Sequence, residues 1–164
     1  IGLFQYQKNL PALLKIVERL PDIQFKVAGK SLSIIDLETE VALNKLKNLK
    51  NVEFVGLLTR YEVFKFLSKA HCLLNTSHIE GFSNTYLEAF SVGTPVVTRH
   101  RTDPDNIILK YKLGKSVKHY SELPTAIAEL INTNVDTEYL KNYLFLNHNP
   151  MILVKNLLNM IRIK

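Results

Sequence analysis

The sequence has one cysteine, no apolar run long enough for a membrane span, and no repeat or low-complexity tract. The single cysteine, Cys72, excludes a disulfide framework and a thiolate metal cluster, and it fits a reducing cytosol. A membrane-spanning helix needs roughly 20 consecutive apolar residues, which no part of this chain approaches. No group of His, Asp and Glu has the spacing of metal ligands. We therefore expect a soluble, cytoplasmic protein without a metal.

The first residues contain neither an initiator methionine nor a targeting pattern, and Ile1 already resembles part of a strand. With 164 residues, the chain has about the length of one domain and is long enough to bury one core. Apolar residues make up 46% and charged residues 22%, which is typical of folded proteins and not of disordered ones. We expect residues 1–164 to be one domain of a longer protein.

The formal charge of +6 is scattered over the chain. The densest basic runs are 45–50 and 110–119, and no aromatic residues are regularly spaced between their basic residues. Solvent-exposed surface is therefore favoured over a nucleic-acid-binding site for these runs. We expect no nucleic-acid partner. An anionic small ligand, or peripheral contact with an anionic membrane, remains compatible with the excess charge.

Short strand-like runs alternate with helical stripes along the chain. Strands are predicted at 25–29, 52–56, 72–75, 95–98 and 115–117, and helices at 9–20, around 42–49, 59–67, 84–92, 123–131 and around 152–161. Strands that alternate with helices need crossover connections, and these produce a parallel sheet covered on both faces. The sequence therefore predicts a doubly wound, Rossmann-like α/β domain, with residues 132–149 unassigned.

One polar loop stands out, in the segment "SHIEGFSNTYLEAFSVGTPVVT" at residues 77–98. In an open parallel sheet, ligands bind outside the carboxyl ends of the strands, where a loop enters a helix. A helix that begins near Asn84 would point its free N–H groups and positive dipole end at this place, which suits a phosphate or diphosphate. Gly81 would let the backbone approach the ligand closely. Glu80 in the loop and Glu88 in the helix would face the same crevice and accept hydrogen bonds from sugar hydroxyls.

Two structural alternatives remain open from spacing alone. Thr85 and Glu88 also match a capping box, so Glu88 would then only cap its own helix. Glu80 would then be a solvated loop charge. Short motifs produce many false matches, and the spacing does not decide between these readings and a binding site.

The segment "EGFSNTYLEAFSVGTPVV" resembles the E-x7-E signature region of retaining glycosyltransferases of the GT-B fold, of the group 1 or family four type. "QKNLPALLKIVERLPDIQFKVAGK", "NVEFVGLLTRYEVFKFLSKAHCLLNTS" and "SELPTAIAELI" resemble other parts of the same family in the same order, so the resemblance covers nearly the whole chain. It implies the C-terminal, donor-binding half of a GT-B fold, whose N-terminal acceptor domain is absent from these residues.

The resemblance also implies roles for individual residues. Glu80 would lie beside the donor sugar near the reacting centre, Lys8 would contact the diphosphate, and Glu88 would bind the nucleotide ribose. The remaining donor contacts would come from Gly81 and from the backbone amides of Phe82, Ser83, Asn84 and Thr85.

The implied reaction is hexosyl transfer with retention from a UDP-, GDP- or ADP-sugar to an acceptor hydroxyl, without a metal. A glycan or lipid-linked acceptor would bind through the absent domain, and this part alone would be inactive. The pathway would be the synthesis of a polysaccharide, lipopolysaccharide or other glycoconjugate.

The sequence departs from the family pattern in two places. Leu3 stands where the family usually has an arginine, and residues 98–108 lack the usual Gly-Gly turn and glutamate. Arg99 or Arg101 would supply the missing charge, or this segment is a surface loop without a role. These departures favour the alternative of a non-catalytic nucleotide-sugar binding module.

A third possibility, an unrelated doubly wound domain of the epimerase or response-regulator sort, ranks last. No phosphoacceptor aspartate ends a first strand, which counts against the regulator version. His71 and His78 are interpreted as structural residues.

Overall fold

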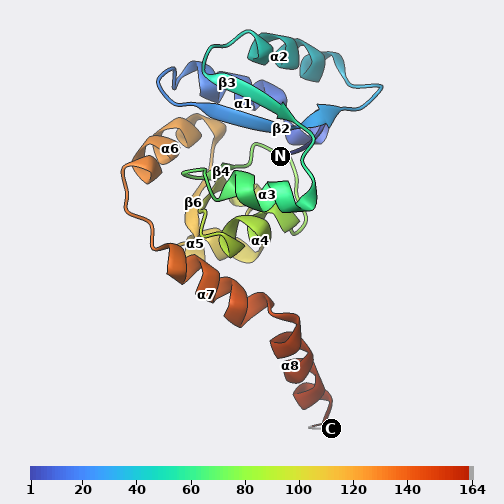
Figure 1. The fold of residues 1–164 in the computed structure, drawn as a ribbon, viewed down its shortest axis with the longest axis vertical. Coiled ribbons are helices and arrows are strands. Elements are labelled where there is room, and N and C mark those ends of the chain that lie inside the picture. Colours follow the sequence, from blue (N-terminus) through green and yellow to red (C-terminus); the bar gives the residue numbers. More distant parts are fainter. Residues whose placement is uncertain (163–164) are drawn as a thin grey trace.

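The computed structural model describes residues 1–162 and has an α/β architecture (Figure 1). Within this range, six strands pair only in parallel and form two three-stranded sheets, in the orders β1-β2-β3 and β4-β5-β6. The strands are β1 (Gly2–Phe4), β2 (Phe25–Ser31), β3 (Val52–Gly56), β4 (Leu73–Leu74), β5 (Val96–Arg99) and β6 (Gly114–Val117). The predicted class of parallel α/β domain is confirmed.

Helices connect the strands and cover the sheets. They are α1 (Leu10–Glu18), α2 (Leu37–Lys47), α3 (Arg60–Leu67), α4 (Asn84–Ser91), α5 (Ile107–Lys110), α6 (Leu123–Ile131), α7 (Thr137–His148) and α8 (Pro150–Arg162), with single 3-10 turns at Tyr6–Lys8, His100–Thr102, Pro104–Asn106 and Tyr120–Glu122. In Figure 1, α1 and α2 lie with β1 to β3 at the top, whereas α3 and α4 lie with the second sheet. α7 and α8 extend away from both sheets towards the C-terminus.

The helix starts follow local sequence signals. Asn9 accepts a hydrogen bond from the backbone N–H of Ala12 at 3.2 Å and caps α1. Asp36 caps α2 in the same way through Thr39. Thr59 and Glu62 form a capping box at the start of α3, with both reciprocal bonds formed.

α6 joins the two halves of the domain. It packs on β5 and β6 and also contacts α1, and its buried residues Leu123 and Ile127 share one apolar core with Phe25 and Val27 of β2. A second core lies around α4 and includes Tyr86, Phe90 and α7 residues. The domain is therefore one packed unit although its strands form two sheets.

The strands fall into two sheets because β1 pairs only with β2 and β4 only with β5. β1 has three residues and pairs only with the last residues of β2, from Gly29 to Ser31. β4 has two residues and pairs with β5. In the part of the chain that the structure describes, no ladder joins β1 to β4, and the edges of the two sheets face each other across a cavity.

Candidate active site

Glu80 lies in the loop between β4 and α4 and forms an ion pair with Lys8. Lys8 Nζ is 2.5 Å from Glu80 Oε1, and the hydroxyl of Ser77 donates to the same oxygen at 2.7 Å. The Glu80 side chain is 10% exposed and that of Lys8 30%. The alternative of a solvated loop charge is therefore wrong for Glu80.

The pKa of Glu80 results from opposing effects. Burial of the carboxyl group raises it, but hydrogen bonds from Lys8 and Ser77, together with the charge of Lys8, outweigh burial and hold the pKa of Glu80 below its ordinary value. The carboxylate is consequently ionised at neutral pH. It is an acceptor and not a proton donor in this state.

Two loops that are about 70 residues apart in sequence meet at this ion pair. The hydroxyl of Thr76 donates to the carbonyl of Lys8 at 2.9 Å, and the backbone N–H of His78 donates to the carbonyl of Gln7 at 2.9 Å. The side-chain amide of Gln7 donates to the carbonyl of Ile79, also at 2.9 Å. These bonds fix the turn after β1 against the loop after β4, so Lys8 and Glu80 are brought together by the backbone and not only by their charges.

The N-terminus of α4 lies directly after this loop. Ser83 is the N-cap residue, and its side chain makes no capping hydrogen bond. The first backbone N–H groups of α4, from Asn84 onwards, are therefore not capped by that side chain and remain suited to an anion. Thr85 lies inside the helix, so the capping box expected from Thr85 and Glu88 is wrong.

Glu88 lies in the middle of α4 and is half-buried. Among residues 1–162, its carboxylate has no hydrogen-bond or ion-pair partner within the chain. The two glutamates therefore occupy the predicted kinds of position, one in the loop and one in the helix. The roles given to them by the resemblance stay predictions.

α4 is held in place by buried contacts. Tyr86 is fully buried, and its hydroxyl donates to the carbonyl of Thr102 at 2.9 Å and lies 2.9 Å from the hydroxyl of Thr98. Phe90 packs edge-on against Tyr143 of α7. These contacts tie α4 to β5 and to α7, which gives the loop at its start a rigid base.

Ile79, Gly81 and Phe82 are the exposed residues of the loop around Glu80. Apart from Gly81 and its two chain neighbours, no atom of the described residues lies within 4 Å of the position that a Cβ of Gly81 would take, so the space beside its backbone is open. The ring of Phe82 packs against His148 at the end of α7, with 5.3 Å between ring centroids. Sequence reasoning did not identify His148, because the segment 132–149 gave no clear element.

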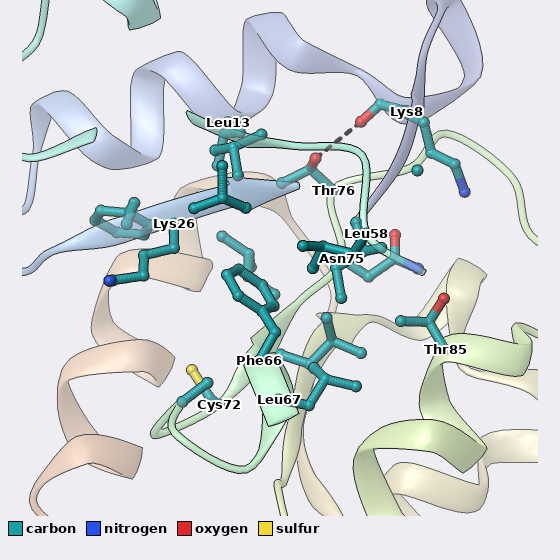
Figure 2. Close-up of a pocket in the computed structure, with 18 of the residues that line it drawn as sticks. Lys8, Leu13, Lys26, Leu58, Phe66, Leu67, Cys72, Asn75, Thr76 and Thr85 are labelled. Atoms are coloured by element: carbon teal, nitrogen blue, oxygen red, sulfur yellow. Dashed lines mark hydrogen bonds between the residues drawn. The ribbon is translucent and has the colours of Figure 1, made fainter. Parts of the chain in front are cut away.

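A cavity of about 660 Å³ extends from this site between the edges of the two sheets. Figure 2 shows Lys8, Asn75 and Thr85 at one side of it, and Leu13, Phe66 and Cys72 further along. The end next to the ion pair carries Lys8, and Lys26, Lys65 and Lys69 line other parts of the cavity. The remaining lining is mostly apolar.

The histidines and the cysteine have no visible chemical role. His78 stacks on Tyr6 with 4.7 Å between centroids, and His71 is exposed. Burial raises the pKa of Cys72 to about 11, so its thiol is protonated at neutral pH. In the part of the chain described, no three His, Cys, Asp or Glu residues lie together as a metal site, and no helix has the length and apolar composition to cross a membrane.

Comparison with known proteins identifies the family of this chain. Residues 1–144 match the family model described as "Glycosyl transferases group 1". The chain is 27% identical over 134 residues to the uncharacterized glycosyltransferase MJ1178 of Methanocaldococcus jannaschii, which covers 80% of this chain and 37% of that protein. The chain thus spans little more than a third of the length of this curated relative.

Solved structures agree on the fold. The C-terminal domain of the group 1 glycosyl transferase LpcC of Francisella tularensis superposes with a TM-score of 0.74 at 18% identity, covering 92% of this chain and 84% of that one. Anabaena HepE, solved in complex with UDP, gives a TM-score of 0.74 at 14% identity, covering 99% and 48%. The fold is that of the C-terminal half of a GT-B glycosyltransferase.

Proposed function

Because the chain belongs to the group 1 glycosyl transferase family, we propose that it is the donor-binding domain of a retaining glycosyltransferase. It binds a nucleotide-diphosphate sugar, and the complete enzyme transfers the hexosyl group to an acceptor hydroxyl. The product is a polysaccharide, lipopolysaccharide or other glycoconjugate. The whole protein's activity is part of this proposal, since the chain spans only part of its relatives.

The observation that carries the proposal is the Lys8–Glu80 pair at the N-terminus of α4. A cation, an ionised carboxylate and uncapped helix N–H groups lie at the carboxyl ends of parallel strands, where nucleotide ligands bind. Lys8 and the amides from Phe82 to Thr85 neutralise the diphosphate. Glu80 accepts hydrogen bonds from the donor sugar, and Glu88, which has no partner among the described residues, accepts them from ribose.

In the proposed transfer, catalysis comes largely from electrostatic stabilisation of the charge that develops on the leaving diphosphate. The bond between the anomeric carbon and the diphosphate oxygen breaks while the acceptor oxygen bonds to the same face of that carbon, and the acceptor proton passes to the departing diphosphate. The negative charge that develops on the diphosphate is stabilised by Lys8 and by the helix N–H groups. No step in this scheme requires a metal.

The second candidate function is a nucleotide-sugar binding module without catalysis. It is favoured by Leu3, which stands where the family usually has an arginine, and by the altered segment after β5. Both candidates require donor binding, so turnover by the complete protein separates them.

Donor binding by the 164-residue chain tests the proposal directly. We expect UDP, GDP or ADP, or a corresponding nucleotide sugar, to raise the melting temperature of the wild-type chain in a thermal-shift series. The Glu88→Gln variant should lose most of this shift. Glu40→Gln, a matched change at an exposed glutamate of α2, should keep it. A series without any shift, or an equal shift in both variants, would overturn the assignment.

A further inference from the structure

The loop that carries Glu80 is held by a second set of contacts from β5 and from the 3-10 turn before α6. Arg99 Nη2 donates to the carbonyl of His78 at 3.3 Å and to that of Ser77 at 3.5 Å. The hydroxyl of Tyr120 donates to the same Ser77 carbonyl at 3.3 Å. Three donor contacts therefore converge on two adjacent carbonyls of the loop.

Arg99 and Tyr120 also support each other. The guanidinium carbon of Arg99 lies 3.8 Å from the centroid of the Tyr120 ring, which is a close cation–π contact. Tyr120 is half-buried, and its ring also meets His78 edge-on with 6.5 Å between centroids. The planar guanidinium is thus fixed between an aromatic face and the loop backbone.

Ser77 transmits this support to the carboxylate. It is 2% exposed, its N–H donates to Asn75 Oδ1 at 2.8 Å, and its hydroxyl donates to Glu80 Oε1 at 2.7 Å. A displacement of the Ser77 backbone would move its hydroxyl away from Glu80. The contacts run without a gap from Arg99 and Tyr120 through Ser77 to Glu80.

These contacts bear on how Arg99 would act in catalysis. Its Nη2 is bonded to the loop, and its Nε is buried without a partner among the described residues. Arg101, two residues further on, is exposed. The hydrogen bonds of Nη2 commit this end of the Arg99 guanidinium to the loop backbone.

We propose that Arg99 and Tyr120 form a clamp on the carbonyls of Ser77 and His78 that positions Glu80 for the donor sugar. In this assignment Arg99 is a positioning residue. It does not replace the arginine that the family usually has at the position of Leu3. The proposal rests on the proposed function for its consequence in catalysis. The clamp itself can be tested without any substrate.

The first test reads the loop directly in the 164-residue chain by NMR. Arg99→Met removes the guanidinium, Arg99→Lys keeps the charge but loses the planar fork, and Tyr120→Phe keeps the ring but loses the hydroxyl. Arg101→Met is the matched control. Amide exchange of Ser77 and His78, and the titration of the Glu80 carboxyl carbon, are followed in each variant.

We expect amide exchange at Ser77 and His78 to become about tenfold faster in both Arg99 variants, since each loses charge-assisted hydrogen bonds. The pKa of Glu80 should rise towards its ordinary value in the same variants. Tyr120→Phe should change both readouts in the same direction, and Arg101→Met neither. If Arg99→Lys behaves like the wild type, Arg99 acts only through its charge and the clamp is refuted.

The second test uses the complete enzyme. A positioning role predicts that Arg99→Lys lowers kcat by about tenfold with donor KM nearly unchanged, whereas a direct diphosphate contact predicts a raised KM. If the wild-type protein neither binds nucleotides nor transfers sugar, the proposed function fails, but the exchange and titration results still decide whether the clamp exists. Unchanged exchange and titration in a folded Arg99→Met variant would overturn the clamp in either case.

Discussion

At the scale of single residues, Glu80 and Glu88 differ in their surroundings. Glu80 is held by Lys8 and Ser77, both within hydrogen-bonding distance of one carboxylate oxygen. Glu88 is half-buried and has no partner within the described part of the chain. A residue that is already fixed suits a reacting centre, where geometry matters most, and an unpaired one suits a ligand that supplies its own hydroxyl groups.

This difference predicts separable kinetic effects in the complete enzyme. Glu88→Gln should raise the donor KM by about tenfold with little change in kcat, because a ribose contact is the same in the ground state and the transition state. Glu80→Gln should lower kcat by about 100-fold or more with KM nearly unchanged, because its contacts strengthen as the glycosidic bond breaks. Steady-state kinetics against the donor check both. Reversed effects would mean that the two roles are exchanged.

His148 predicts a dependence of stability on pH. It packs against Phe82 and Tyr143, and burial lowers its pKa from the ordinary 6.5. The unfolded chain therefore binds a proton at a higher pH than the folded chain does. The stability present above about pH 6.5 is lost progressively as the pH falls towards the lower folded pKa.

His148→Phe keeps an aromatic ring at this position but removes the titrating group. Urea unfolding at pH 7.5 and 5.5 should show a smaller loss of unfolding free energy in this variant than in the wild type. His71→Gln, at an exposed site, should behave like the wild type. An equal loss in all three proteins would show that other groups dominate in this pH range.

The sequence predicted site roles for Glu80, Glu88 and Lys8, which stay predictions, but it did not predict the contacts that hold Glu80 and Lys8. Glu80 stands in a motif that can be recognised in the sequence. Lys8 was assigned from the resemblance to the glycosyltransferase family. The hydrogen bonds from Ser77, Thr76 and Gln7 depend on where two distant loops meet, and no local pattern encodes that meeting. The sequence indicated only the charge of Arg99. Its stacking on Tyr120 was not predictable, because the two residues lie in segments that are remote in sequence.

At the scale of elements, local signals located most of the helices and strands, and parallel strands were predicted, but the division into two sheets was not. The capping residues Asn9 and Thr59 and the strand Val52–Gly56 lie where the sequence predicts them. α7 was not predicted, although Asp136 caps it and Leu140 and Tyr143 are buried. Its exposed residues Phe145 and Leu146 obscure the helical pattern.

Among the described residues, most of the apolar side chains of α8 are exposed. Its exposed apolar residues are Met151, Leu153, Val154, Leu157, Leu158, Met160 and Ile161. The helix contains no acidic residue. This composition is typical of a helix that lies on an anionic membrane surface.

We predict that the chain binds vesicles of mixed phosphatidylglycerol and phosphatidylcholine through α8, more weakly at high salt. Leu157→Asp should weaken the partition by about tenfold or more, since burying a leucine side chain contributes about 1.5–3 kcal/mol. Asn156→Asp adds the same charge at an exposed polar position and should have a much smaller effect. Co-sedimentation measures both. Absence of binding by the wild type would contradict the prediction.

At the scale of the whole molecule, the site lies where the two sheets meet. Lys8 follows the sheet β1-β2-β3, whereas Glu80 and α4 follow β4 of the other sheet. The class of fold was predictable from the alternation of strands and helices. The division into two sheets was not, because periodicity identifies strands but not which of their edges pair.

This arrangement makes the domain half of a catalytic unit under the proposed function. The proposed donor site is open beside Gly81, where a Cβ would meet no described residue other than the chain neighbours within 4 Å. This chain covers 48% of the HepE structure and 37% of the archaeal relative. Under the proposed function, an acceptor site and a barrier against water would lie outside these 164 residues.

A donor site without an acceptor site should bind nucleotides but transfer no sugar. The 164-residue chain should bind one of UDP, GDP or ADP weakly, with a Kd on the order of 0.1 to 1 mM, about −4 to −5.5 kcal/mol. It should transfer no hexose from the corresponding nucleotide sugars, because donor closure and acceptor positioning are absent and proximity supplies much of the rate. Calorimetry measures the binding, and a radiolabelled transfer assay measures turnover beside the complete enzyme. Robust transfer by the chain alone would contradict the two-domain mechanism, whereas binding without turnover even by the complete enzyme would favour the non-catalytic module.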